Sequence, residues 1–269
     1  MRAIARAYVL VLSAVISAGL AMGQAPAIAS GGVVNGASFE KGQPIAPGSL
    51  FSIFGTQLAS KTAQADSIPL STSLGGVSVQ FVSGSTTFNA PLLFVQPGAA
   101  SQINAQVPWE LASGTVNVVV TRDGVASAPA PVTIGAASPA IFSSSGRAVA
   151  VNTDGSLAWP AGAVAGANSH PAKPGDVITI YASGLGPVDS PVADGQNSLD
   201  KLRHTQTMPV VMVGGMGADV LFAGLSPQFV GVNQLNVKIP NVAPGDAVPL
   251  QIQIGGVTSS ASLTIAIGQ

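Results

Sequence analysis

The chain has 269 residues, of which 47% are hydrophobic and 8% are charged, and it contains 32 glycines, 20 prolines and no cysteine. This composition is typical of short strands joined by tight turns, and it excludes both a disordered chain and a fold held together by disulfide bonds. The formal net charge is only −1 and no basic stripe is visible, so nucleic acid is not an expected partner.

The first 23 residues have the parts of a secretory signal peptide. Arg2 and Arg6 form a basic start, residues 7–20 are apolar, and small residues precede the expected cleavage after Gly23. Cleavage after Ala29 is a second possibility. An uncleaved anchor is a third, but the apolar run is shorter than the ~20 residues that a membrane-spanning helix needs.

We therefore predict an exported protein, extracellular, at the cell surface or periplasmic, with no membrane span after cleavage. Loss of two of the 10 basic residues leaves eight against 11 acidic residues, so the mature protein carries a net charge of −3.

One segment occurs twice: residues 101–108 (SQINAQVP) return as residues 233–240 (NQLNVKIP). Apolar and polar residues alternate in both copies, which is the period of a strand with one buried and one wet face. Proline ends each strand because it has no N–H for the ladder. The side chains expected to face inward are Ile103, Ala105, Val107, Leu235, Val237 and Ile239.

Other elements repeat in the same order around this segment. A Pro-Gly turn leads into an apolar strand at residues 50–58 and again at residues 177–185. Each half also closes with a hairpin, whose turn is Asp123-Gly124 in the first copy and Gly255-Gly256 in the second. Both dipeptides tolerate the positive φ angles of a two-residue hairpin turn.

The repeat divides the chain into a signal peptide at residues 1–23, a first domain at 24–137 and a second domain at 138–269. Each domain has about seven short strands at the spacing of an antiparallel sandwich. The predicted fold class is therefore all-β, with two tandem immunoglobulin-like β-sandwiches. The short connection at residues 135–140 predicts that the domains share an interface.

These features resemble known domains. The Pro-Gly turn before a strand, the strand ending in Val-Pro or Ile-Pro, and the closing hairpin resemble the IPT/TIG type of immunoglobulin-like domain. More closely, the mature chain resembles an uncharacterised C-terminal domain of exported proteins from Solibacter-type soil Acidobacteria. The segments that carry this resemblance are residues 45–49, 102–110, 152–156, 171–176 and 221–225.

Two features depart from that family's pattern. His170 stands where Asn is common, and residues 201–204 (KLRH) interrupt a loop that usually has no distinctive sequence. The resemblance implies an immunoglobulin-like fold and export, and it brings no catalytic residues with it.

The sequence contains no recognisable catalytic constellation. A serine nucleophile needs a base within reach, the histidines are His170 and His204, and no serine lies in a G-x-S-x-G elbow. Asp200 precedes His204 by four residues and would allow a dyad, but Lys201 and Arg203 beside it favour a solvated loop. We predict that the protein is not an enzyme, and we keep a hydrolase as the second alternative.

No metal or cofactor is predicted. The chain has no H-E-x-x-H sequence and no twelve-residue calcium loop ending in Glu. Residues 152–155 (NTDG) begin like a run of oxygen ligands but equally form a hairpin turn. Asp189 and Asp194 could join a surface cation site. The glycine-rich residues 214–217 connect two strands, whereas a phosphate-binding loop opens a helix.

Possible ligand contacts come from two groups of residues. Trp109 and Trp159 could offer aromatic platforms to a sugar, although such rings are equally suited to covering the core. The outward amides of the repeated strand could bind a ligand if the same face is open in both domains, or they could serve neighbouring polar groups. These amides are Gln102, Asn104, Gln234 and Asn236.

The leading hypothesis is a non-enzymatic interaction or adhesion module whose partner is an unknown protein or polysaccharide. A carbohydrate-binding module is the alternative. We expect a monomer or weak self-association.

Overall fold

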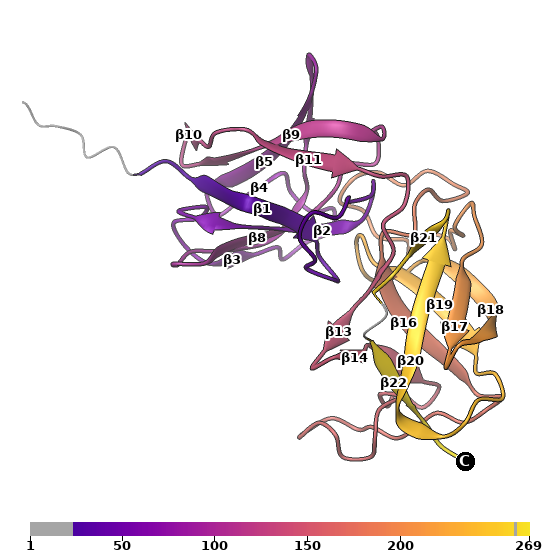
Figure 1. Ribbon diagram of the computed structural model, residues 1–269. Coiled ribbons are helices and arrows are strands. Elements are labelled where there is room, and N and C mark those ends of the chain that lie inside the picture. The colour runs from indigo at the N-terminus through magenta and orange to yellow at the C-terminus, as the bar shows by residue number, and fades with distance from the viewer. Residues whose placement is uncertain (1–23, 261–262) are drawn as a thin grey trace, which may run out of the picture.

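A computed structural model describes residues 24–260 and 263–269, which form strands, turns and connecting segments. Within these residues, no helix is long and apolar enough to cross a membrane. The predicted signal peptide lies outside the described residues. Figure 1 shows two β-domains joined end to end, so the predicted all-β class and the tandem sandwiches are confirmed.

The first domain contains two antiparallel sheets. One sheet has the order β1 (Ala27–Asn35), β2 (Leu50–Thr56), β8 (Ser101–Gln106), β7 (Leu92–Gln96) and β3 (Ala63–Gln64). The other places β9 (Gly114–Arg122) between β5 (Val77–Ser83) and β11 (Ala130–Ile134), with β6 (Thr86–Asn89) beside β5. The short strands β4 (Ser73–Leu74) and β10 (Val125–Ala126) pair with β5 and β9. This is the strand order of an immunoglobulin-like sandwich.

The second domain repeats that order. β12 (Ala140–Ile141) and β15 (Ala150–Asn152) pair with β16 (Val177–Ser183), which pairs with β19 (Asn233–Lys238). On the other side, β20 (Gly245–Ile254) lies between β17 (Val210–Val213) and β22 (Thr264–Ile267). Short additions are β13 (Ser143–Ser144), β14 (Arg147–Ala148) and β21 (Val257–Thr258).

Strand β18 (Met216–Leu225) makes the second domain differ from the first. Residues 216–218 pair with β17 and residues 219–225 pair with β19, with a register shift between Val220 and Phe222. One long strand therefore belongs to both sheets, and the irregularity lies just after the point where it changes partner.

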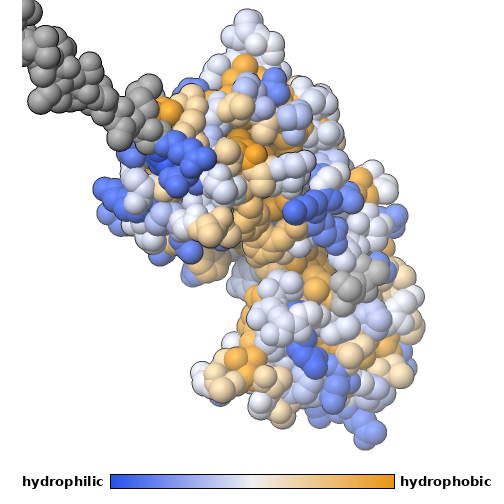
Figure 2. Space-filling view, turned by 60° about the vertical axis from the view of Figure 1, so that its left-hand side comes forward, coloured by the Kyte–Doolittle hydropathy of each residue, from blue (hydrophilic) through white to orange (hydrophobic). Residues whose placement is uncertain are grey.

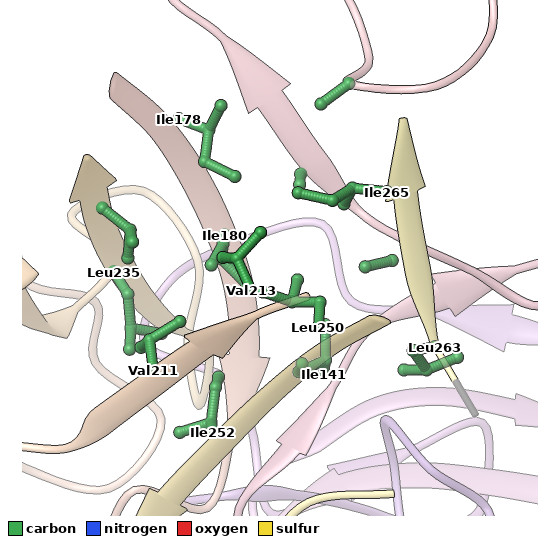
Figure 3. Close-up of a cluster of buried hydrophobic side chains, with 14 of the residues drawn as sticks. Ile141, Ile178, Ile180, Val211, Val213, Leu235, Leu250, Ile252, Leu263 and Ile265 are labelled. Atoms are coloured by element: carbon green, nitrogen blue, oxygen red, sulfur yellow. The ribbon is translucent and has the colours of Figure 1, made fainter. Parts of the chain in front are cut away.

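The repeated segment forms the matching strands β8 and β19, each between two neighbours. The six side chains that were predicted to face inward are all between 0 and 2% exposed, so the prediction is confirmed. Figure 3 shows the core of the second domain, where Leu235 of β19 lies among side chains of β16, β17 and β20. Burial of these branched side chains holds the two sheets together.

The closing hairpins also have the predicted turns. Asp123 and Gly124 have φ angles of 49° and 82°, and Gly255 and Gly256 have φ angles of 58° and 80°. Two successive residues with positive φ match the right-handed twist of the flanking strands. The sequence therefore sets the register of each terminal hairpin locally.

We predict that Leu235→Ala lowers the free energy of unfolding by about 2–5 kcal/mol, because it removes a buried side chain and leaves a cavity. Lys238→Ala is the control, since Lys238 is exposed on the same strand and should change stability by no more than about 0.5 kcal/mol. Urea unfolding followed by circular dichroism measures both. Equal effects of the two substitutions would contradict the register.

Candidate ligand-binding cleft between the two domains

The two domains are joined through a buried serine. Ser183, the last residue of β16, accepts a hydrogen bond from the Leu50 N–H at 3.0 Å and donates one to the Gly231 carbonyl at 2.9 Å. Leu50 begins β2 in the first domain. The hydroxyl therefore fixes the start of a strand in one domain to the end of a strand and a loop in the other.

The connection between the domains is held in a second place. The Asn35 side-chain amide donates to the Ser138 carbonyl at 2.9 Å, and the Ser138 hydroxyl donates to the Pro44 carbonyl at 2.7 Å. The Ser138 N–H in turn donates to the Gly184 carbonyl at 2.8 Å. The predicted interface between the domains is thus present, and the linker is part of it.

A loop of the second domain, residues 191–197, makes the third connection. The Gly195 N–H donates to the side-chain oxygen of the fully buried Gln106 at 2.7 Å. The Leu70 N–H donates to the Gly195 carbonyl at 2.9 Å, and the Trp109 N–H donates to the Asp194 carboxylate at 2.9 Å. Three separated attachments restrict hinge motion between the domains.

A cleft of about 490 Å³ lies beside this joint. One wall comes from the first domain and contains residues 65–68, Leu70, Leu50 and Leu93. The other comes from the second domain and contains residues 228–230 and Val232. Most of the lining is aliphatic, and Asp66 is its single charged residue. Figure 2 shows apolar side chains gathered on the surface where the two domains meet.

Two exposed apolar side chains stand on opposite walls of the cleft. Phe229 is 52% exposed and Ile68 is 45% exposed. The Phe229 ring packs edge-on against Tyr181, with 6.3 Å between ring centroids and an interplanar angle of 79°. Tyr181 lies on β16, so the exposed ring is braced by a regular element.

The two tryptophans that were considered as sugar platforms occupy packing positions. Trp159 is 4% exposed, and its indole N–H donates to the Ala148 carbonyl at 2.7 Å. Trp109 is partly buried with its ring over Gly48, where a Cβ would collide with it. The buried Trp109 indole N–H has no partner among the described residues. These positions favour the packing interpretation for both rings.

The outward amides form the same small network in each domain. Gln102 donates to the Asn104 side-chain oxygen at 2.7 Å, and the Ser52 hydroxyl donates to that oxygen at 2.8 Å. In the second copy, Gln234 and the Thr179 hydroxyl donate to the Asn236 side-chain oxygen at 3.0 and 3.2 Å. All four amide residues are half-buried, and the structure joins them within each sheet without bringing the two networks into one site.

The structure does not form the dyad considered for His204. Asp200 instead binds the Arg203 guanidinium through two hydrogen bonds of 2.6 and 3.0 Å, because the fork of Arg203 matches the carboxylate. His204 lies 3.2 Å from the carboxylate of Asp189. The hydrogen bonds that Arg203 donates to Asp200 lower the pKa of the Asp200 carboxyl. Sequence distance alone selected the wrong carboxylate for His204.

The oxygen-rich turn at residues 152–155 is also occupied by protein groups. The Asp154 carboxylate accepts hydrogen bonds from the hydroxyl and N–H of Ser156 and lies 2.9 Å from His170. The Ser156 bonds, followed by that of His170, lower the pKa of Asp154. No group of three or more metal-ligating side chains is found in the described residues.

The residues of the cleft were not singled out from the sequence. Phe229 follows Ser-Pro-Gln, and Ile68 lies between Ser67 and Pro69. A large apolar residue in a turn-forming context was the only available signal, because nothing local to either loop shows that the two loops face each other.

The chain was compared with family models, curated proteins and solved structures. No family model and no curated protein match it. A similar solved structure is SGBP-B of the Bacteroides ovatus mixed-linkage glucan utilization locus, in complex with a mixed-linkage heptasaccharide (12% identity, TM-score 0.33, 84% of this chain and 43% of that one). Domains 5–6 of the S-layer protein SbsC are also similar, with 11% identity and a TM-score of 0.28 over 90% of this chain and 98% of that one. So are the FN1–FN3 domains of chicken CNTN1, with 12% identity and a TM-score of 0.23 over 90% of this chain and 66% of that one.

The chain spans less than half the length of that SGBP-B protein. The strand order of each domain defines the class of this protein as tandem immunoglobulin-like sandwiches. Its resemblance to IPT/TIG domains and to the acidobacterial domain stays a prediction.

One titratable group lies in the joint beside the cleft. Burial of the Asp194 carboxyl and the neighbouring Glu110 carboxylate raise the pKa of Asp194 to about 6, against the opposing effect of the Trp109 N–H. This pKa is higher than that of an unfolded aspartate, so the folded protein favours the protonated carboxyl. The resulting stabilisation is present below about pH 4 and is lost as the pH rises through about 6.

We predict that Asp194→Asn makes the protein more heat-stable at pH 7.5, because Asn still accepts from the Trp109 N–H and carries no charge beside Glu110. The gain in melting temperature should be on the order of 2–4 °C and should disappear near pH 4.5, where Asp194 is protonated. Calorimetry of both proteins across this range measures the effect. A difference that does not change with pH would contradict the assignment.

Proposed function

We propose that this chain is an exported, non-enzymatic binding module that holds its ligand in the cleft between the two domains. The observation that carries the proposal is an apolar cleft of about 490 Å³ with walls from both domains. Such concave, largely apolar sites with a few polar groups are the usual form of a binding site.

The joint beside the cleft supports this function. Leu50 lines the cleft and donates its N–H to Ser183, and Leu70 lines it and donates to Gly195. The first-domain wall is therefore fixed to the interdomain contacts at two points before a ligand arrives. A site that is already in its binding geometry loses less conformational entropy when it binds.

A monomer or a weakly associating protein fits this proposal. At one edge of each sheet in the first domain, the strands β3 and β4 have two residues each, and such a short edge offers little template for pairing with another chain.

A carbohydrate ligand is the second candidate, favoured by the exposed Phe229 ring on its Tyr181 support. An aromatic face can stack on the apolar face of a sugar ring, and Gln228 and Ser67 supply polar partners nearby. In this alternative, Phe229 takes the place of Trp109 and Trp159 as the platform.

We predict that the purified protein co-sediments with isolated cell envelopes or binds one member of a soluble polysaccharide panel in a calorimetric titration, and that Phe229→Ala weakens this binding at least about tenfold. Met216→Ala is the matched control, because Met216 is similarly exposed but lies at the opposite end of β18 from the joint. Binding that survives Phe229→Ala unchanged would refute the cleft as the site.

We also predict that the exported protein begins at Gln24. The Gln24 carbonyl accepts a hydrogen bond from Arg122 at 2.8 Å, and Ala27 and Ile28 pair with Thr56 and Gly55 in β1 and β2. Cleavage after Ala29 would remove these contacts. Mass spectrometry of the secreted or envelope fraction identifies the first residue, and a chain starting at Ser30 would contradict the prediction.

A further inference from the structure

We infer that the ligand of the cleft is an extended polypeptide segment with apolar side chains and one lysine or arginine. This inference rests on the proposed function and names the class of its ligand. It follows from three properties of the cleft: the chemistry of its walls, the sign of its charge and the state of its main-chain groups.

The walls are more aliphatic than a sugar would require. The aliphatic side chains that line the cleft are Leu50, Ala65, Ile68, Leu70, Leu93, Val230 and Val232. Against these stand one aromatic ring, Phe229, and the polar side chains of Asp66, Ser67 and Gln228. A sugar presents hydroxyl groups on most sides, and the aliphatic side chains of this lining offer them no hydrogen-bond partner. Aliphatic side chains of a peptide bury apolar surface there without that cost.

The negative charge of the cleft favours a basic side chain in the ligand. Asp66 is exposed, lines the cleft and forms no ion pair among the described residues. No lysine, arginine or histidine lines the cleft. A basic side chain in the ligand therefore gains an attractive partner, whereas an acidic one faces a like charge.

The loops of the two walls also have main-chain donors to spare. Within the described residues, the N–H groups of Asp66, Ser67 and Ile68 donate no hydrogen bond to another protein group, and neither do those of Gln228 and Phe229. An extended peptide carries a carbonyl at every residue and can accept from such groups, as in other complexes where a strand-like ligand lies along a loop or sheet edge. The apolar walls of the cleft then contact every second side chain of the peptide.

The test begins with a phage-displayed library of random dodecapeptides, panned on the immobilised wild-type protein and counter-selected on Phe229→Ala. We expect the enriched peptides to place a lysine or arginine within a run of apolar residues. The best peptide is then synthesised in two forms, the original and one with its basic residue changed to Gln. Fluorescence anisotropy measures the binding of both to the wild type, to Asp66→Asn and to the control Met216→Ala.

On the wild type, the Gln form should bind about three- to tenfold more weakly than the original, and Asp66→Asn should weaken the original by a similar factor. The two changes together should cost little more than either alone, because both remove the same interaction. Met216→Ala should bind like the wild type.

Three results would overturn the inference: no enriched peptide, enriched peptides without a basic residue, or equal effects of Asp66→Asn on the two peptide forms. If a polysaccharide instead binds and is lost in Phe229→Ala, the proposed cleft stands and the peptide inference fails. If neither kind of ligand responds to Phe229→Ala, the cleft itself is refuted.

Discussion

The buried hydroxyl of Ser183 sets the relation between the two domains. It accepts a hydrogen bond from the Leu50 N–H of one domain and donates one to the Gly231 carbonyl of the other. Both main-chain groups are withdrawn from water at this point, and an unpaired buried polar group costs free energy. The favoured arrangement of the two domains is therefore one in which the Leu50 N–H and the Gly231 carbonyl both keep their hydrogen bonds to Ser183. The cleft follows from this arrangement, because Leu50 lines it and Gly231 lies between two residues that do.

The duplicated sandwich uses one plan with two different connections. In both domains the central strand of the repeat buries its apolar side chains and ties its outward amides to a hydroxyl on the neighbouring strand. This network satisfies polar groups on a half-buried face. In the second domain, β18 continues from one sheet into the other. The copies thus share a register and differ in how their sheets are linked.

The candidate site is composed mainly of loop residues, beside Leu50 of β2 and Leu93 of β7. Loop 65–70 follows the edge strand β3, and loop 228–232 connects β18 to β19. Loops carry binding functions more readily than strands, since their side chains are not needed for the core. The tryptophans show the opposite case: Trp159 satisfies a backbone carbonyl within the second domain, and Trp109 covers a turn at the joint. In these positions the large apolar rings pack against protein groups and are withdrawn from solvent.

The sequence by itself determined the fold class, the duplication, the inward face of β8 and β19 and the turns of the closing hairpins. These features depend on local periodicity and on the φ angles that particular residues tolerate, so they can be read along the chain. Only the tertiary structure decided that His204 lies beside Asp189 and not Asp200, and that Asp66 and Phe229 line one cleft. Such contacts join residues from separate loops, and their positions depend on how two whole domains pack against each other. The spacing of residues within one stretch of sequence therefore does not show which residues of separate loops lie close together.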